Sequence, residues 1–175
     1  SYNKLQLTWD AVEGANGYVV YRIESNGALT KIRTVNETSY TISKDITCGK
    51  TYRFTVKAYT LLDDSVTEVY SDYDQAGLKA KAKPATPTLV SATSTAYNKV
   101  TVKWKKVTKA YGYYIYRKEA GNADSSWKKV KTINYGDTTT AVDSKAVPGV
   151  KYVYTVKAYT KVNGRKVAGD ADQKG

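Results

Sequence analysis

The sequence predicts an all-β chain made of two tandem β-sandwiches, and three observations carry this prediction. A long segment repeats along the chain, apolar side chains alternate with polar ones, and turn residues separate the alternating segments. Alternation with a period of two is typical of antiparallel strands that have one buried face and one face in water. No segment shows the 3.6-residue period of an amphipathic helix.

The internal repeat is the strongest of these observations. The letters Thr-Val-Lys-Ala-Tyr-Thr at residues 55–60 recur at residues 155–160, within a longer duplication. Such a repeat predicts two copies of one module and excludes a single large fold. We expect one domain at residues 1–83 and another at residues 84–175, each large enough to bury a modest core without a disulfide. The expected linker, residues 83–87, holds two of the three prolines, which stiffen a short connection.

Alternating segments mark the expected strands of each copy. The first runs over residues 5–9, where Leu5, Leu7 and Trp9 share one face. The other inward-facing sets are Tyr52, Phe54, Val56 and Ala58 in the first copy, and Val100, Val102, Trp104, Tyr152, Tyr154, Val156 and Ala158 in the second. The many Tyr, Val and Thr residues suit pleated surfaces.

Turn chemistry agrees with this assignment. Asn163-Gly164 predicts a two-residue hairpin turn, because both residues tolerate a positive φ. In the first copy, Asp63-Asp64 takes the place of this turn.

Four features recur in the same order in both copies. A Trp ends the second strand, a Gly-Tyr-x-Val/Ile-Tyr-Arg segment follows, then a short Lys-x-x-Thr-Val/Ile segment. Last comes Gly-x-x-Tyr-x-Φ-x-Val-x-Ala-Tyr, with Φ aromatic. They occupy Trp9, 17–22, 31–35 and 49–59 in the first copy, and Trp104, 112–117, 129–133 and 149–159 in the second. Together they resemble the fibronectin type III family, in the form common in large surface and secreted proteins of Gram-positive bacteria.

The resemblance implies an immunoglobulin-like sandwich of seven strands, A to G, in each copy, joined by the short Pro-containing linker. It also implies that Tyr52 and Tyr152 are tyrosine corners, whose hydroxyls return to nearby backbone. Against this pattern the first copy lacks strand A and the second lacks the end of strand G. The missing parts are either trimmed from this segment or supplied by a neighbouring chain or module, since an unpaired edge is a template for strand addition.

The composition argues against an enzyme. Histidine is absent, which removes the usual general base and the commonest metal ligand. The close carboxylate pairs, such as Asp72 and Asp74, fall in expected loops and lack the further ligands of a calcium site. Cys48 has no histidine to activate it, and we read it as a small space filler. We therefore expect no catalytic residue, no metal site and no cofactor.

Charge is shared unevenly between the copies. Residues 1–83 carry 11 basic and 10 acidic residues, whereas the remainder carries 17 and 6, so that nearly all of the net charge of +12 lies in the second copy. A basic module attracts anionic polymers such as acidic glycans or anionic wall polymers. The alternative is a lysine-rich solvated face that prevents edge-to-edge pairing. The lysines are spread along strands and do not cluster in a groove, so we expect no specific nucleic-acid binding. No apolar run is long enough for membrane insertion.

An aromatic surface is the remaining candidate for binding. If Tyr113 and Ile115 point inward, alternation turns Tyr114 and Tyr116 outward on the sheet of strands C, F and G. The candidate binding residues are Tyr21, Lys57 and Tyr59 in the first copy, and Tyr114, Tyr116, Lys157 and Tyr159 in the second. Flat tyrosines beside lysines stack on sugars or dock a protein. The alternative is cross-strand Tyr–Lys packing that only protects the sheet.

These observations, with the resemblance, predict non-catalytic modules of a secreted or wall-attached bacterial protein, located outside the cell or on its surface. The expected role is a spacer and presentation unit within a longer chain of modules, with adhesion to a host or bacterial surface protein or a glycan. The alternative is an accessory part of an extracellular polysaccharide-degrading enzyme.

Overall fold

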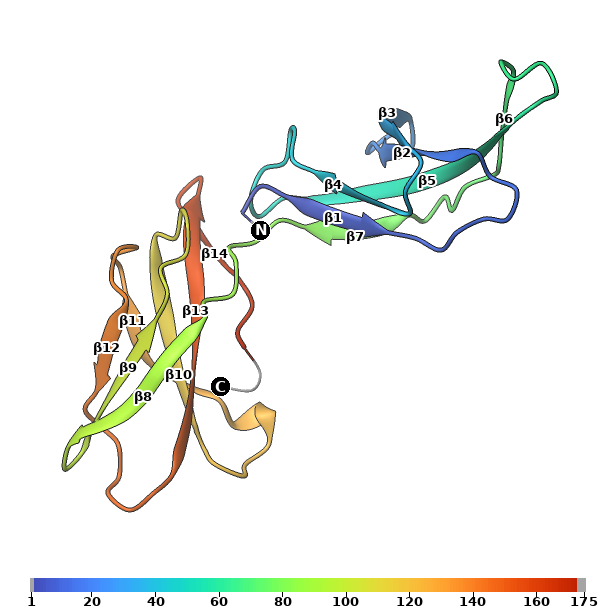
Figure 1. Ribbon diagram of the computed structural model, residues 1–175. Coiled ribbons are helices and arrows are strands. Elements are labelled where there is room, and N and C mark those ends of the chain that lie inside the picture. Colours follow the sequence, from blue (N-terminus) through green and yellow to red (C-terminus); the bar gives the residue numbers. More distant parts are fainter. Residues whose placement is uncertain (1, 173–175) are drawn as a thin grey trace. The chain divides into compact units, whose positions relative to one another are not determined.

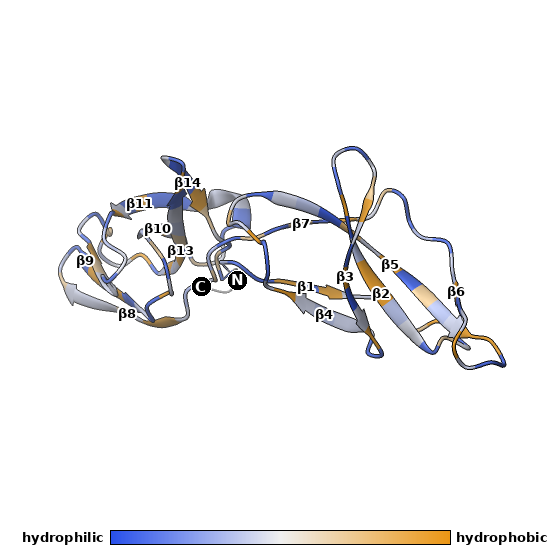
Figure 2. Ribbon diagram, turned by 90° about the horizontal axis from the view of Figure 1, so that it is seen from above, coloured by the Kyte–Doolittle hydropathy of each residue, from blue (hydrophilic) through white to orange (hydrophobic). Residues whose placement is uncertain are grey.

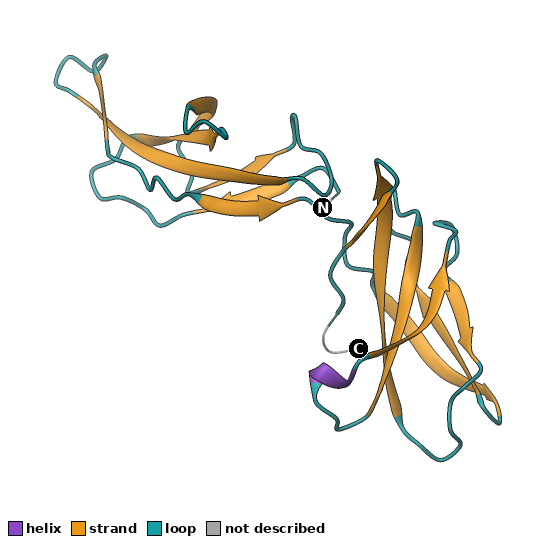
Figure 3. Cartoon of the chain, turned by 180° about the vertical axis from the view of Figure 1, so that it is seen from behind, coloured by secondary structure: helices purple, strands orange, loops and turns teal. Residues whose placement is uncertain are grey.

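The computed structural model describes residues 2–172 and contains two compact units. The N-terminal unit is Asn3–Ala82, and the C-terminal unit contains the residues from Lys83 onward together with Tyr2. Strands dominate both units, and within residues 2–172 the only helical element is a single 3₁₀ turn, η1, at Asp124–Ser126 (Figure 3).

The N-terminal unit consists of a small and a large antiparallel sheet. The small sheet pairs β1 (Leu5–Thr8) with β4 (Ser39–Ile42). The large sheet has the order β3–β2–β5–β6, and β7 also pairs with β5. These strands span Gly17–Ile23 (β2), Leu29–Val35 (β3), Thr51–Leu61 (β5), Glu68–Tyr70 (β6) and Leu78–Lys81 (β7).

The C-terminal unit repeats this plan in two layers, coloured green to red in Figure 1. One sheet has the order β12–β9–β8 and the other β11–β10–β13–β14. The strands span Leu89–Ala96 (β8), Lys99–Trp104 (β9), Gly112–Glu119 (β10), Lys128–Ile133 (β11), Thr140–Asp143 (β12), Tyr152–Val162 (β13) and Arg165–Ala168 (β14).

The two units differ at their sheet edges. In the C-terminal unit β8 pairs along β9, whereas no strand within residues 2–172 pairs with the corresponding edge of β1. Conversely, β7 pairs with the first residues of β5, and the matching part of β13 has no such partner in the described chain. The edges are where the sequence departs from the seven-strand pattern.

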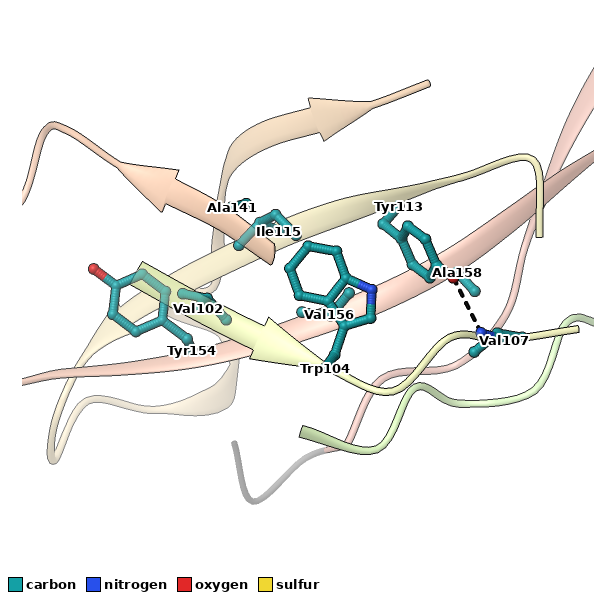
Figure 4. Close-up of a cluster of buried hydrophobic side chains, with 9 residues drawn as sticks. All are labelled: Val102, Trp104, Val107, Tyr113, Ile115, Ala141, Tyr154, Val156 and Ala158. Carbon is teal, nitrogen blue, oxygen red and sulfur yellow. Dashed lines mark hydrogen bonds between the residues drawn. The ribbon is translucent and has the colours of Figure 1, made fainter. Parts of the chain in front are cut away.

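Each unit buries its own core of apolar residues, which come mainly from strands in which hydrophobic and hydrophilic residues alternate along the ribbon (Figure 2). The N-terminal core contains Leu5, Leu7, Val20, Ile42, Ile46, Tyr52, Phe54 and Ala82. The C-terminal core contains Val102, Trp104, Val107, Tyr113, Ile115, Ala141, Tyr154, Val156 and Ala158 (Figure 4). The expected inward sets therefore agree with the observed cores, although Trp9, Val56, Val100 and Tyr152 are only partly buried.

The turns follow the predicted chemistry. Asn163 and Gly164 both have positive φ, of 48° and 76°, and join β13 to β14 as a two-residue hairpin. The Tyr52 hydroxyl accepts a hydrogen bond from the Thr47 amide at 2.8 Å. The Tyr152 hydroxyl accepts one from the Val147 amide at 3.3 Å, so both tyrosine corners form.

The predicted fold class is confirmed. In each unit the smaller sheet (β1–β4, or β12–β9–β8) packs against the larger sheet (β3–β2–β5–β6, or β11–β10–β13–β14) in the fibronectin type III-like arrangement, and the C-terminal unit has the additional first strand β8.

Candidate functional site on the tyrosine–lysine face

Strand register gathers tyrosines and lysines on one side of the four-stranded sheet of the C-terminal unit. Tyr113 and Ile115 are buried in the core, which turns Tyr114 and Tyr116 to the opposite side of β10. Tyr114 pairs with Lys157 across to β13, and Lys161 pairs with Lys166 across the hairpin. We call this side the tyrosine–lysine face and assign to it Tyr111, Tyr114, Tyr116, Lys129, Lys157, Tyr159, Lys161 and Lys166.

The burial of Tyr159 contradicts one prediction. The sequence suggested that it projects from the face for binding, but its side chain is 0% exposed. Its ring lies against Gly112, its neighbour across the strands, where a Cβ would come within 2.9 Å of the ring. The hydroxyl donates to Asn134 Oδ1 at 2.5 Å. Tyr159 is thus a structural residue that fills the space left by a glycine and cannot itself contact a partner.

The rings form a packed row over this glycine. Tyr114 stacks on Tyr159, with ring centroids 4.6 Å apart and an interplanar angle of 17°. Tyr111 packs against Tyr159 at 5.9 Å and is itself 41% exposed. Since Tyr159 supports both neighbours, the sides of Tyr114 and Tyr111 that face away from it are held in fixed positions.

Lysine ammonium groups lie over these rings at cation–π distances. Lys161 Nζ is 4.0 Å from the Tyr111 centroid, and Lys166 Nζ is 4.7 Å from that of Tyr159. Lys129 Nζ is 4.7 Å from the Tyr114 centroid, and Lys157 Nζ is 5.3 Å from that of Tyr116. The face is therefore a positively charged layer seated on aromatic rings.

The protonation states at this face follow from its packing. A hydrogen bond with Lys161 and the positive charge of that lysine lower the pKa of the Tyr111 hydroxyl, while the same hydrogen bond raises the pKa of Lys161. Burial raises the pKa of Tyr114 and of Tyr159. Lys161 is therefore held in its charged form more firmly than an isolated lysine.

The corresponding face of the N-terminal unit is less basic. Tyr21, Lys57 and Tyr59 lie there as predicted by alternation, and each is half-buried. Tyr59 lies against Gly17 as Tyr159 lies against Gly112. Lys57 Nζ is 4.8 Å from the Tyr73 ring centroid.

Sequence reasoning missed Tyr111, Lys129, Lys161 and Lys166. The two-residue turn at Asn163-Gly164 already places Lys161 opposite Lys166, and this pairing was the available signal. Tyr111 precedes β10, in an irregular segment where alternation says nothing about side-chain direction.

Sequence reasoning also missed a buried polar cluster at one end of the C-terminal core. Arg117 Nη1 donates to Asp143 Oδ2 at 2.7 Å, and the Tyr154 hydroxyl donates to the same oxygen at 3.0 Å. The Asp143 side chain is 3% exposed, and Asp143 Oδ1 accepts from the Lys145 amide. In Figure 4, which draws the apolar core, Tyr154 lies at the end opposite Tyr113. Every polar atom of the carboxylate is satisfied within the protein, so the cluster is a structural ion pair.

The remaining candidates for chemistry are dispersed. No group of three or more Cys, Asp or Glu residues that could hold a metal ion occurs in the part of the chain that the structure describes. Asp64 accepts hydrogen bonds from the Val66 and Thr67 amides and so shapes its own loop. Cys48 is buried, and burial raises the pKa of its thiol. Within residues 2–172 no helix is long and apolar enough to span a bilayer.

Comparison with known proteins gives structural likeness only. No family model and no curated protein matches the chain. Among solved structures, the FN1–FN3 domains of chicken CNTN1 are similar at 19% identity and a TM-score of 0.41, covering 98% of this chain. A two-domain fibronectin type III segment of chicken tenascin is similar at 17% identity and a TM-score of 0.44, covering 97% of this chain and 91% of its own. An Fn3-like protein from Clostridium thermocellum is similar at 26% identity and a TM-score of 0.39 over 50% of this chain and 88% of its own. This chain spans 62% of the CNTN1 segment.

Proposed function

We propose that the chain is a non-catalytic spacer and presentation segment of a secreted or surface-attached bacterial protein, and that its tyrosine–lysine face makes adhesive contacts. The observation that carries the proposal is the use of inward side chains. In both units they are committed to separate packed cores, and the chemically distinctive residues lie on an outer sheet face.

Two self-contained cores support the spacer role. Each unit buries its own cluster of apolar residues, and the connecting segment after Ala82 contains Pro84 and Pro87. Proline restricts the backbone of a short connection and thereby limits the motion of the units it joins. The bacterial and extracellular setting rests on the sequence resemblance.

A binding screen against neutral glycans, acidic glycans and surface proteins tests the adhesive role. Tyr116 is the best single position for a variant, because it is half-buried on the face and its removal leaves the core intact. We expect Tyr116→Ala to weaken retention of the ligand found by about tenfold, since aromatic residues that contact ligands contribute on the order of 1–2 kcal/mol or more. An unchanged unfolding midpoint must accompany this loss. Hydrolysis of any polysaccharide by the purified chain would overturn the non-catalytic assignment.

The second candidate, an accessory module of a polysaccharide-degrading enzyme, is favoured by the same flat aromatic and cationic surface. It requires a catalytic domain elsewhere in the parent protein. Fusing the chain to a hydrolase and measuring hydrolysis of insoluble and soluble substrate separates the two. An accessory module raises activity on the insoluble form alone.

A further inference from the structure

Part of the charge difference between the two copies lies at matching positions of one sheet face. The outer side of the four-stranded sheet in the C-terminal unit carries five lysines. They are Lys118, Lys129, Lys157, Lys161 and Lys166. At the same register positions the N-terminal unit has Ile23, Lys31, Lys57, Leu61 and Glu68. Two apolar residues and one carboxylate are thus replaced by cations in the same fold.

Four of the five lysines have no ion-pair partner among the residues that the structure describes. Lys118 is paired with Asp124 at 2.6 Å, whereas none of the ion pairs within residues 2–172 involves the other four. Asp124 is the carboxylate paired with Lys118 at the border of the face, and the backbone carbonyl of Asp172 accepts a hydrogen bond from Thr155. At the centre of the face, Lys161 lies over Tyr111, and Lys166 lies over Tyr159 with Tyr114 beside it.

The rings hold these cations in place. Lys161, Lys166 and Lys129 each lie within 5 Å of a tyrosine centroid, and the rings beneath them are fixed by stacking on the buried Tyr159. An ammonium on an aromatic face keeps N–H donors directed to solvent. Ordering the lysines before a ligand arrives reduces the side-chain entropy that binding costs.

The shape of the face selects among polyanions. It is a side of a twisted sheet, with side chains spaced by roughly 5 Å across strands and roughly 7 Å along them. Proteins that bind single-stranded nucleic acid present bare aromatic rings in a basic groove, on which bases stack. Here a lysine ammonium of the same unit lies over each of the rings of Tyr111, Tyr114 and Tyr116, so the face presents cations seated on rings where such a groove presents bare rings.

We propose that the tyrosine–lysine face of the C-terminal unit binds a linear acidic polysaccharide through an array of tyrosine-seated lysines centred on Lys161 and Lys166. The proposal rests on the adhesive role and names its ligand class, a sugar chain carrying carboxylates or sulfates at regular intervals. The N-terminal unit, with Leu61 and Glu68 at the matching positions, does not bind it.

The experiment measures binding of the full chain to polygalacturonate, dextran sulfate, neutral dextran and a single-stranded oligonucleotide at physiological salt. The test variant is Lys161→Gln/Lys166→Gln. Its control, Lys103→Gln/Lys105→Gln, removes the same charge from exposed positions on β9 and just after it, in the other sheet. We expect the test variant to weaken binding to the acidic polysaccharides by about tenfold or more, because each lysine beside an anionic surface contributes several-fold. The control should change it less than about twofold, within the range of screened long-range charge effects.

A gain-of-function variant tests whether the loss of polysaccharide binding comes from the lysine pair itself and not from a disturbed structure. Leu61→Lys/Glu68→Lys recreates the lysine pair in the N-terminal unit, and we expect it to raise the affinity for the same polysaccharides. Equal losses in the test and control variants would show attraction by net charge alone and overturn the proposal. Preference for the oligonucleotide would assign the face to nucleic acid and overturn it as well. Binding only to neutral dextran or to a surface protein would overturn the acidic ligand while leaving the adhesive role standing.

Discussion

The two units fill the same end of their cores with chemically different residues. In the N-terminal unit Ile42 and Phe54 are buried there, and Arg22 turns to Glu24 at 2.7 Å. At the equivalent positions the C-terminal unit has Asp143, Tyr154 and Arg117. The hydroxyl of Tyr154 needs an acceptor once it is buried, Asp143 supplies it, and Arg117 neutralises the carboxylate.

This difference teaches that the fold tolerates either an apolar or an ionic end, provided that the group is complete. A buried ion pair can often be replaced as a whole by apolar residues with little loss, but removing one partner leaves an uncompensated charge. The two copies are a natural version of that replacement within one chain.

The largest expected effect comes from breaking the ionic group in part. Asp143→Ile should lower the free energy of unfolding by about 3–5 kcal/mol, because Arg117 and the Tyr154 hydroxyl lose their buried partner. Asp143→Ile/Tyr154→Phe, which copies the N-terminal residues, should recover most of this loss, since Glu119 matches Glu24 as a partner for the arginine. Urea denaturation of the three proteins measures both values. Additive losses in the double variant would show that the two copies are not interchangeable.

The second largest expected effect is a difference in the stability cost of replacing two equivalent glycines, Gly112 and Gly17. A Cβ on Gly112 would lie 2.0 Å from the Ile133 carbonyl oxygen, whereas on Gly17 the nearest atoms are those of the Tyr59 ring at 2.7 Å. Backbone cannot move aside as a side chain can, so Gly112→Ala should cost about 3 kcal/mol and Gly17→Ala about 1 kcal/mol. Thermal or urea unfolding of each variant gives the ranking, and a larger cost at Gly17 would contradict it.

The smallest expected effect is a loss of folding stability at alkaline pH that comes from Tyr154 in the C-terminal unit. Burial, and then the hydrogen bond to Asp143, raise the pKa of Tyr154 from 10.0 to about 12. Because the folded state holds this proton more tightly, the stabilisation is complete below about pH 10 and is lost as the pH rises towards 12. At about pH 11 the loss due to Tyr154 should be about 1 kcal/mol.

Tyr154→Phe isolates this effect, because the substitution removes the Tyr154 hydroxyl and leaves the other tyrosines in place, including Tyr70, whose pKa is raised to about 12 by its hydrogen bond to Glu68. The measurement is the urea midpoint between pH 8 and 11. The variant should show a shallower alkaline decline than the wild type, and parallel declines would show that Tyr154 does not carry it. Phe54 at the matching N-terminal position has no such proton.

The sequence predicted which side of the sheet carries the tyrosines of the candidate face, but it did not predict which of them are buried. Alternation placed Tyr114 and Tyr116 outward because Tyr113 and Ile115 are core residues, and this needs only the geometry of one strand. Alternation also placed Tyr159 outward, correctly as to side. Its burial depends on Gly112 in another strand and on the rings of Tyr111 and Tyr114, which no local pattern contains.

The sequence by itself determined the strands, their inward faces and the hairpin at Asn163-Gly164, which follow from periodicity and turn chemistry acting over a few residues. The long internal repeat determined the two modules, and the family resemblance implied both tyrosine corners. Only the tertiary structure decided which outward side chains are covered, how lysines sit on rings, and that Arg117, Asp143 and Tyr154 meet in one core. The reason is that burial and charge pairing depend on residues brought together from distant positions by strand register, and register is a property of the assembled sheets.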